Sequence, residues 1–113
     1  MKNILILSDP EETPSIIEMI NKSACVMKRI GRLHYEFIDD GVKYEFKSLA
    51  SVDLVDDDNI FTNWIIGRKF DSVFLTKNIN NKIPNTIMEM LLSSTENGVL
   101  ELQTNYRLRR NND

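Results

Sequence analysis

The stretch ILILSDPEETPSIIEMI at residues 4–20 decides the fold of this chain. It opens with a continuous apolar run, ILIL, which is typical of a central strand covered on both faces. Asp9 or Thr13 can cap a helix that follows, and Pro14 suits its first turn because that position needs no N–H. We therefore expect a buried strand, a turn and a helix that ends at Gly31. Apolar residues with helical spacing form the inner face of this helix: Ile16, Ile17, Ile20, Ala24 and Met27.

The turn SDPEETPS has the length of the phosphate-binding loop GxxxxGK(S/T) but lacks its chemistry. Ser8 and Thr13 stand at the glycine positions, and Pro14 stands at the lysine position. Backbone N–H groups at the helix start could still bind a phosphate, although Glu11 and Glu12 would place negative charges beside it. Turns rich in Asp, Ser, Thr and Pro also join strands to helices in any parallel α/β protein. The turn is therefore evidence about the fold first.

Length and composition limit the class of protein. A chain of 113 residues, 42% hydrophobic and 27% charged, fits a single domain, 1–113, that folds without metal ions or disulfides. No window approaches the roughly 18 apolar residues of a membrane span, and MKNILILSDP turns acidic too early for a signal peptide. Cys25 is the only cysteine and His34 the only histidine, so we expect no zinc site and no internal disulfide. These features predict a cytoplasmic protein without a cofactor.

Residues 33–47, LHYEFIDDGVKYEFK, carry the clearest local signal. Apolar residues alternate with polar ones on both sides of Asp40-Gly41, a pair that favours a two-residue hairpin turn. This turn places the apolar side chains of both strands on one face of the hairpin. It predicts these cross-strand pairs: Phe37 with Tyr44, Tyr35 with Phe46, and Glu36 with Glu45.

The rest of the chain alternates helices and strands. The acidic run at 56–58 precedes an apolar stretch and predicts a short helix that ends at Gly67. Residues 71–76 predict a second buried strand, KNINNKIPN a polar loop, and Pro84 the first turn of another helix. Residues 99–110 alternate apolar and polar side chains and predict an amphipathic edge strand.

This order of elements is typical of an α/β protein. We expect a three-layer sandwich in which three helices cover a mixed sheet. The sheet would have a parallel centre, with the antiparallel hairpin of residues 33–47 at one side.

The segment order resembles the first part of a P-loop ATPase core, of the kind found in phage packaging motors and related helicases. The matching pieces are ILILSDPEETPS, the hairpin that ends in YEFKSLAS, and IIGRKFDSVFLTKN, which together cover residues 3–103. Thr76 and Lys77 stand where that family has its paired metal-binding acids. The resemblance therefore implies a nucleotide-binding-like frame without a catalytic set. A weaker resemblance to phospho-acceptor receiver domains, through ILILSDPEE and FDSVFLTKN, lacks its acidic residue at the same position.

Three other groups could carry chemistry, and each also has a simpler interpretation. The aspartates within residues 53–58 lack the spacing of a calcium loop and fit a solvated helix start. Glu36 and Glu45 could share a proton, but a pair on an exposed sheet face usually stays ionised. Cys25 and His34 could form a nucleophile and base, but a partly buried thiol explains Cys25 as well.

The predicted helices carry more apolar side chains than a one-sided surface helix needs. Exposed apolar patches with aromatic and methionine side chains are the usual composition of a partner site, although deep packing against the sheet would also account for them. The residues that we expect at such a contact are Phe61, Trp64, Met88 and Met90, with Arg107 and Arg109 at its rim.

We therefore expect a protein that is not an enzyme but a protein-binding module: a regulator, inhibitor or assembly subunit. Its partner would be another protein or a second copy, and not a membrane. Abundant Asn, Ile and Lys are typical of AT-rich coding sequences such as those of many phages. Two alternatives stay open. The turn Ser8–Ser15 could bind a phosphate or nucleotide weakly, or the basic C-terminal strand could serve a nucleic-acid accessory role despite a net charge of −3.

Overall fold

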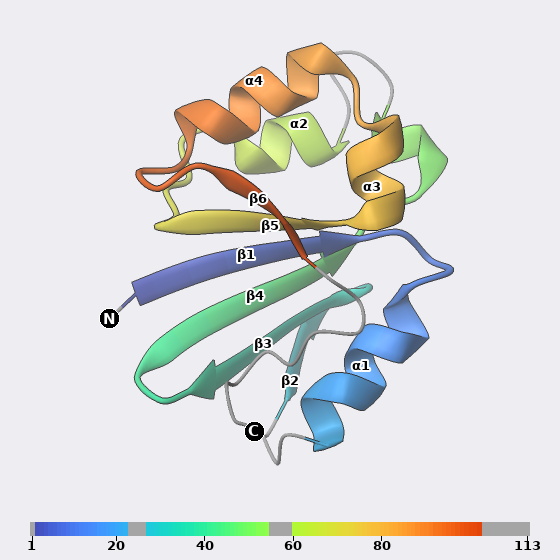
Figure 1. The fold of residues 1–113 in the computed structure, drawn as a ribbon, viewed down its shortest axis with the longest axis vertical. Helices are drawn as coiled ribbons and strands as arrows, with labels where there is room; N and C mark the ends of the chain where they lie inside the picture. Colours follow the sequence, from blue (N-terminus) through green and yellow to red (C-terminus); the bar gives the residue numbers. More distant parts are fainter. Residues whose placement is uncertain (1, 23–26, 55–59, 103–113) are drawn as a thin grey trace.

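The computed structural model describes residues 2–22, 27–54 and 60–102 of the chain. Within these ranges the chain forms a mixture of strands and helices (Figure 1). The elements are, in order, β1 (Lys2–Ser8), α1 (Thr13–Lys22), β2 (Lys28–Gly31), β3 (His34–Asp39), β4 (Val42–Ser48), a 3-10 helix (Ser51–Leu54), α2 (Ile60–Ile65), β5 (Ser72–Thr76), α3 (Lys77–Lys82), α4 (Asn85–Ser93) and β6 (Val99–Leu102).

The strands form a mixed sheet in the order β2-β3-β4-β1-β5-β6. β1 pairs in parallel with β4 on one side and with β5 on the other, and β6 continues the parallel part beyond β5. Leu5, Ile6 and Leu7 of β1 are fully buried, as the continuous apolar run predicts for a central strand. The α/β class and the parallel centre of the sheet are confirmed.

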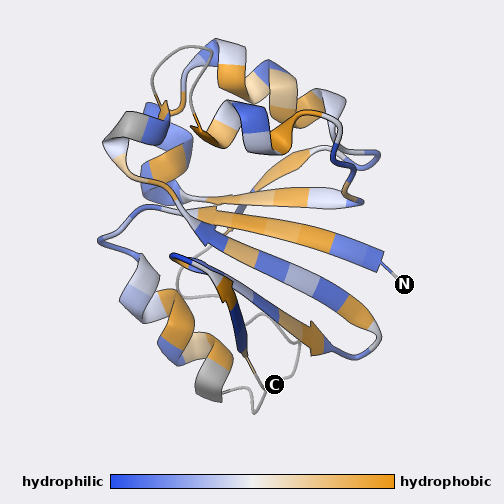
Figure 2. Ribbon diagram, turned by 180° about the vertical axis from the view of Figure 1, so that it is seen from behind, coloured by the Kyte–Doolittle hydropathy of each residue, from blue (hydrophilic) through white to orange (hydrophobic). Residues whose placement is uncertain are grey.

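Helices cover both faces of the sheet and complete the three layers (Figures 1 and 2). On one face, Ile16 of α1 packs in a buried cluster with Ile6 of β1 and Phe46 of β4. On the other face, Phe61 of α2 and Ile87 of α4 belong to a second buried cluster, which also includes residues of β1 and β5. The three-layer sandwich is therefore confirmed, with β1 contributing side chains to both cores.

The hairpin of β3 and β4 has the predicted register. Phe37 pairs with Tyr44, and their rings stack with centroids 4.7 Å apart. Asp40 and Gly41 have φ angles of 53° and 77°, the left-handed conformation that a type I′ turn requires at both central residues. The Asp-Gly signal therefore identified both the turn and the pairing.

The prediction for the segment after α1 is wrong. α1 ends at Lys22, and Gly31 belongs to the strand β2 rather than ending a helix. β2 is held by antiparallel pairing, with Lys28 opposite Glu36 in β3. Met27 packs against the α1-side cluster, as the apolar spacing requires, but it does so from the residue before β2. Ala24 and Cys25 lie outside the described residues.

A helix also replaces a predicted loop. Residues 77–82 form α3, so the described chain has four α-helices where the sequence predicted three. Ile79 anchors this helix because its side chain is fully buried in the core beneath it. The backbone N–H of Asn78 donates a hydrogen bond to the side chain of Glu12, 66 residues earlier in the sequence. Such a distant partner leaves no local signal. The acidic run at 56–58 lies outside the described residues, and α2 begins at Ile60.

Candidate functional site

The carboxyl ends of the parallel strands bring several polar residues to one edge of the sheet. Ser8 ends β1 and pairs in register with Ser48 at the end of β4, and Thr76 ends β5. Ser8 and Thr76 are fully buried, and Asp9 is only 1% exposed. Ligands of open α/β sheets bind at the carboxyl ends of the strands, where connections leave in opposite directions. This edge is therefore the candidate site.

Hydroxyl groups tie the start of α1 to the two strand ends. Thr13 Oγ1 lies 3.0 Å from Ser8 Oγ, 2.9 Å from Ser48 Oγ and 2.8 Å from the carbonyl oxygen of Asp9. These groups satisfy one another within the chain, so their hydrogen-bonding capacity is largely used.

Glu12 turns its carboxylate toward the start of α3. It accepts a hydrogen bond from the hydroxyl of Thr76 and another, at 3.2 Å, from the backbone N–H of Asn78. An N–H group at a strand-to-helix turn is the kind of donor that binds a phosphate oxygen in nucleotide-binding folds. Here the N–H group of Asn78 already donates its hydrogen bond to the carboxylate of Glu12.

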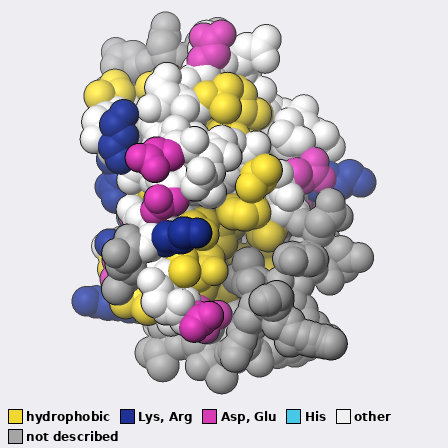
Figure 3. All heavy atoms as spheres, turned by 60° about the vertical axis from the view of Figure 1, so that its left-hand side comes forward, with side chains coloured by type: hydrophobic (Ala, Val, Ile, Leu, Met, Phe, Trp, Pro, Cys, Tyr) yellow, Lys and Arg dark blue, Asp and Glu magenta, His cyan; other side chains and the backbone are white. Residues whose placement is uncertain are grey.

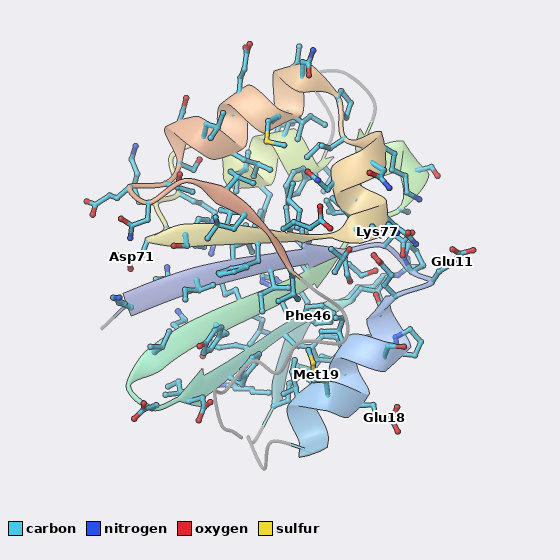
Figure 4. The ribbon with its side chains drawn as sticks, viewed as in Figure 1. Glu11, Glu18, Met19, Phe46, Asp71 and Lys77 are labelled. Atoms are coloured by element: carbon cyan, nitrogen blue, oxygen red, sulfur yellow. The ribbon has the colours of Figure 1, made fainter. Side chains whose placement is uncertain are left out.

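Asp9 is the second carboxylate at this edge of the sheet. Its Oδ1 accepts the backbone N–H of Glu12 at 2.9 Å, and its Oδ2 accepts from Asn78 Nδ2 and from Lys82 Nζ, each at 3.1 Å. Burial raises the pKa of Asp9, but the bonds from Glu12, Lys82 and Asn78 outweigh burial and hold that pKa below its ordinary value. Figure 4 shows the turn that carries Glu11 beside the start of α3 at Lys77.

The arrangement is a carboxylate latch, by which we mean Asp9 and Glu12 bound to Thr76, Asn78 and Lys82. The latch uses the donors of Thr76, Asn78 and Lys82 and adds negative charge where an anionic ligand would lie. The opposing charge of Glu12 was predicted from the sequence, but its partners were not. Asp9 or Thr13 was predicted to cap the helix, and the bond from the Glu12 N–H to Asp9 Oδ1 shows that Asp9 makes a capping bond.

No family model and no curated protein matches this chain. Similarity appears among solved structures. The large terminase from a thermophilic bacteriophage, in crystal form 2, is similar with a TM-score of 0.58 and 10% identity, over 90% of this chain and 26% of that one. The same terminase in complex with ADP gives a TM-score of 0.55 and 11% identity, over 90% and 25% of the two chains.

The similarity to the terminase is one of fold. This chain spans about a quarter of the length of that protein. It agrees with the predicted resemblance to a P-loop ATPase-like frame of the phage packaging type, at an identity too low to transfer residue roles.

A second polar cluster lies on the α2 side of the sheet. Glu45 is opposite Glu36 as predicted, but its side chain is only 3% exposed, so the prediction of an exposed pair is wrong. Both oxygens of Glu45 lie 3.0 Å from Arg68 Nη2, and one lies 2.9 Å from His34 Nε2. Glu36 instead pairs with Lys43 at 3.5 Å. The carboxylates therefore have separate cationic partners and do not form a proton-sharing pair.

Trp64 forms the cover of this second cluster. The guanidinium of Arg68 stacks on its ring at 4.1 Å, and Lys47 Nζ lies 5.1 Å from the ring centroid. His34 meets the same ring edge-on, with centroids 5.3 Å apart. Burial lowers the pKa values of His34 and Lys47 below their ordinary values. A central strand is buried on both faces, and this could have indicated that Glu45 of β4 lies inside.

The predicted contact residues occupy different environments. Phe61 is fully buried in the core, which removes it from any surface in this structure. Trp64, Met88 and Met90 are partly buried and pack against that core. Arg107 and Arg109 lie outside the described residues. Three other apolar residues of the α2 and α4 layer are strongly exposed: Ile60 at 83%, Ile66 at 64% and Leu92 at 50%.

Neither a metal-binding cluster nor a membrane-spanning helix is found in the described part of the chain. Within residues 2–22, 27–54 and 60–102, no three His, Cys, Asp or Glu side chains come together as a metal ion would need. No helix in those same ranges has the length and apolar character to cross a membrane.

Proposed function

We propose that this chain is a non-catalytic, protein-binding module, a regulator, inhibitor or assembly subunit, built on a frame like that of a phage packaging ATPase. The observation that carries the proposal is the carboxylate latch. Glu12 and Asp9 take up the Thr76 hydroxyl, the Asn78 N–H and the Lys82 ammonium at the edge where a nucleotide would bind.

Electrostatics supports the loss of nucleotide binding. A phosphate at this edge would have to displace the Glu12 carboxylate from the Asn78 N–H while the charge of Asp9 stayed buried nearby. Two like charges 4 Å apart near a protein surface repel each other by about 4 kcal/mol. The loop glycines and lysine that would offset this repulsion are absent from the turn, and Thr76 and Lys77 replace the metal-binding acids.

Exposed apolar side chains support the protein-binding part of the proposal. Ile60, Ile66 and Leu92 expose half or more of their surface on the α2 and α4 layer. Figure 3 shows one face of the molecule on which hydrophobic side chains also gather near the centre, with charged side chains around them. An apolar centre with a charged rim is the usual anatomy of a protein contact.

Thermal melting with nucleotides tests the proposal. The purified chain is melted alone and with millimolar ATP, GTP or ADP, each with and without Mg²⁺. We expect no shift in Tm, because the carboxylate latch opposes nucleotide binding. A nucleotide present at 100 times its Kd would add about 2.7 kcal/mol to the free energy of unfolding and raise Tm by several degrees. Such a shift would contradict the proposal. A stoichiometric complex with a protein from the native lysate, measured by light scattering, would support it.

A further inference from the structure

The strand β2 is a terminal strand of the sheet, and within the described residues its outer edge has no pairing strand. β2 (Lys28–Gly31) pairs only with β3 in the sheet order, and no other strand of the described chain lies on its outer side. Lys28, Arg29 and Ile30 are all exposed. The outer edge of a terminal strand presents backbone N–H and C=O groups that another extended segment can pair with.

The positive charge around β2 favours binding of an acidic segment. Residues 27–35 contain Lys28, Arg29 and Arg32 and no acidic residue, in a chain with a net charge of −3. Glu36 lies opposite Lys28 in register, and its carboxylate pairs with Lys43 of β4 at 3.5 Å. Two copies of β2 would bring these basic side chains together, and basic residues on an edge strand commonly block such self-pairing. An acidic strand would instead be attracted.

Apolar side chains lie beside these charges. Of the large hydrophobic residues exposed within the described chain, three belong to this part of the sheet: Ile30 at 41%, Leu33 at 38% and Ile38 at 53%. Ile30 and Leu33 would accept apolar side chains of an incoming strand, while backbone pairing fixes its direction and the basic residues fix its charge.

We propose that the outer edge of β2 binds an extended, acidic and apolar segment of a partner protein by adding it to the sheet as a further strand. This inference rests on the proposed protein-binding function and names the surface and the chemistry of the partner. Lys28, Arg29 and Arg32 attract the acidic side chains, and Ile30 and Leu33 contact the apolar ones.

The test uses the full chain and a fluorescein-labelled ten-residue peptide of alternating Glu and Val, followed by fluorescence anisotropy. We expect saturable binding, shifts of the β2 amide signals by NMR, and at least a tenfold loss of affinity in the variant Lys28→Glu/Arg29→Glu. The matched control is Lys77→Glu, an exposed lysine at the start of α3, which should bind the peptide as the parent does.

Two further probes separate strand addition from simple charge attraction. The same peptide with alternate backbone amides N-methylated keeps its charge but cannot pair fully, so it should bind at least tenfold more weakly. Equal binding of the methylated peptide, or of a single-stranded oligonucleotide of the same charge, would overturn the proposal. If the double variant still forms the native complex while nucleotides leave Tm unchanged, the β2 proposal fails and the proposed function stands.

Discussion

Arg68 binds Glu45 through one nitrogen, Nη2, which lies 3.0 Å from both carboxylate oxygens. The two residues connect the segment that follows α2 with the inner strand β4. The side chain of Glu45 is 3% exposed and that of Arg68 is 36% exposed, so the pair spans the boundary between core and solvent. Arg68 also stacks on the ring of Trp64, with its guanidinium carbon 4.1 Å from the ring centroid.

Replacing Arg68 should destabilise the fold. The variant Arg68→Met leaves the buried carboxylate of Glu45 with the ring of His34 as its hydrogen-bond partner. Removing one partner of a buried ion pair typically costs about 3–5 kcal/mol, and partial exposure of the guanidinium reduces the expected loss to about 2–3 kcal/mol. Urea unfolding measures this change in the free energy of unfolding.

Two companion variants separate charge from packing in that experiment. Arg68→Met combined with Glu45→Gln should recover part of the loss, because it removes the unpaired charge. Lys77→Ala, at an exposed position, should change stability by less than about 0.5 kcal/mol. A loss in Arg68→Met as small as that in Lys77→Ala would show that the pair contributes little.

Stability should fall as the pH drops through the range just below 6.5. Burial lowers the pKa of His34 more than the Glu45 carboxylate raises it, so the folded chain binds this proton less readily than the unfolded chain. The contribution of His34 is therefore present above its ordinary pKa of about 6.5 and is lost as the pH falls toward the folded pKa. The slope cannot exceed about 1.4 kcal/mol per pH unit for one proton.

Urea unfolding between pH 5.5 and 7.5 measures this slope, and NMR titrates the ring directly because His34 is the only histidine. The variant His34→Gln should flatten the profile in this window. An unchanged slope in that variant, or a folded His34 pKa above its ordinary value, would contradict the prediction.

The carboxylate latch should hold the first turn of α1 to the start of α3. Glu12→Ala removes the acceptor for the Thr76 hydroxyl and for the Asn78 N–H. Hydrogen bonds to charged groups contribute about 1.5–3 kcal/mol each, and partial exposure of this edge places the expected loss near the lower figure. Urea unfolding measures the loss, and hydrogen exchange at Asn78 should accelerate with it. Glu11→Ala at the exposed neighbouring position is the matched control and should leave both values unchanged.

Local patterns predicted most of the fold, and long-range contacts account for what they missed. The apolar run of β1 and the Asp40-Gly41 turn depend on neighbouring residues, so both could be read directly. α3 depends on the burial of Ile79 and on a bond from Asn78 to Glu12, neither of which follows from its Asn-rich sequence. β2 depends on pairing with β3, which outweighs the helical spacing that continues to Met27.

The candidate site was predicted less completely than the fold. The missing glycines and lysine of the turn could be read from the sequence, and so could the negative charge of Glu12. The partners of that charge could not, because Thr76 and Asn78 lie in other elements. The sequence likewise could not predict Arg68 as the partner of Glu45, since the two residues belong to different elements and meet only in the folded chain.

The turn of the β3 and β4 hairpin gives a prediction that depends on the backbone alone. Gly41 has a φ of 77° and an added Cβ would meet nothing within 4 Å, so Gly41→Ala would strain the backbone without a clash. An L-residue in the left-handed region costs about 1–2 kcal/mol, and urea unfolding should show a loss of that size. Asp40→Asn is the matched control, because Asn tolerates the left-handed conformation at the φ of 53° found there. Equal stability of Gly41→Ala and the parent chain would mean that the turn rearranges at little cost.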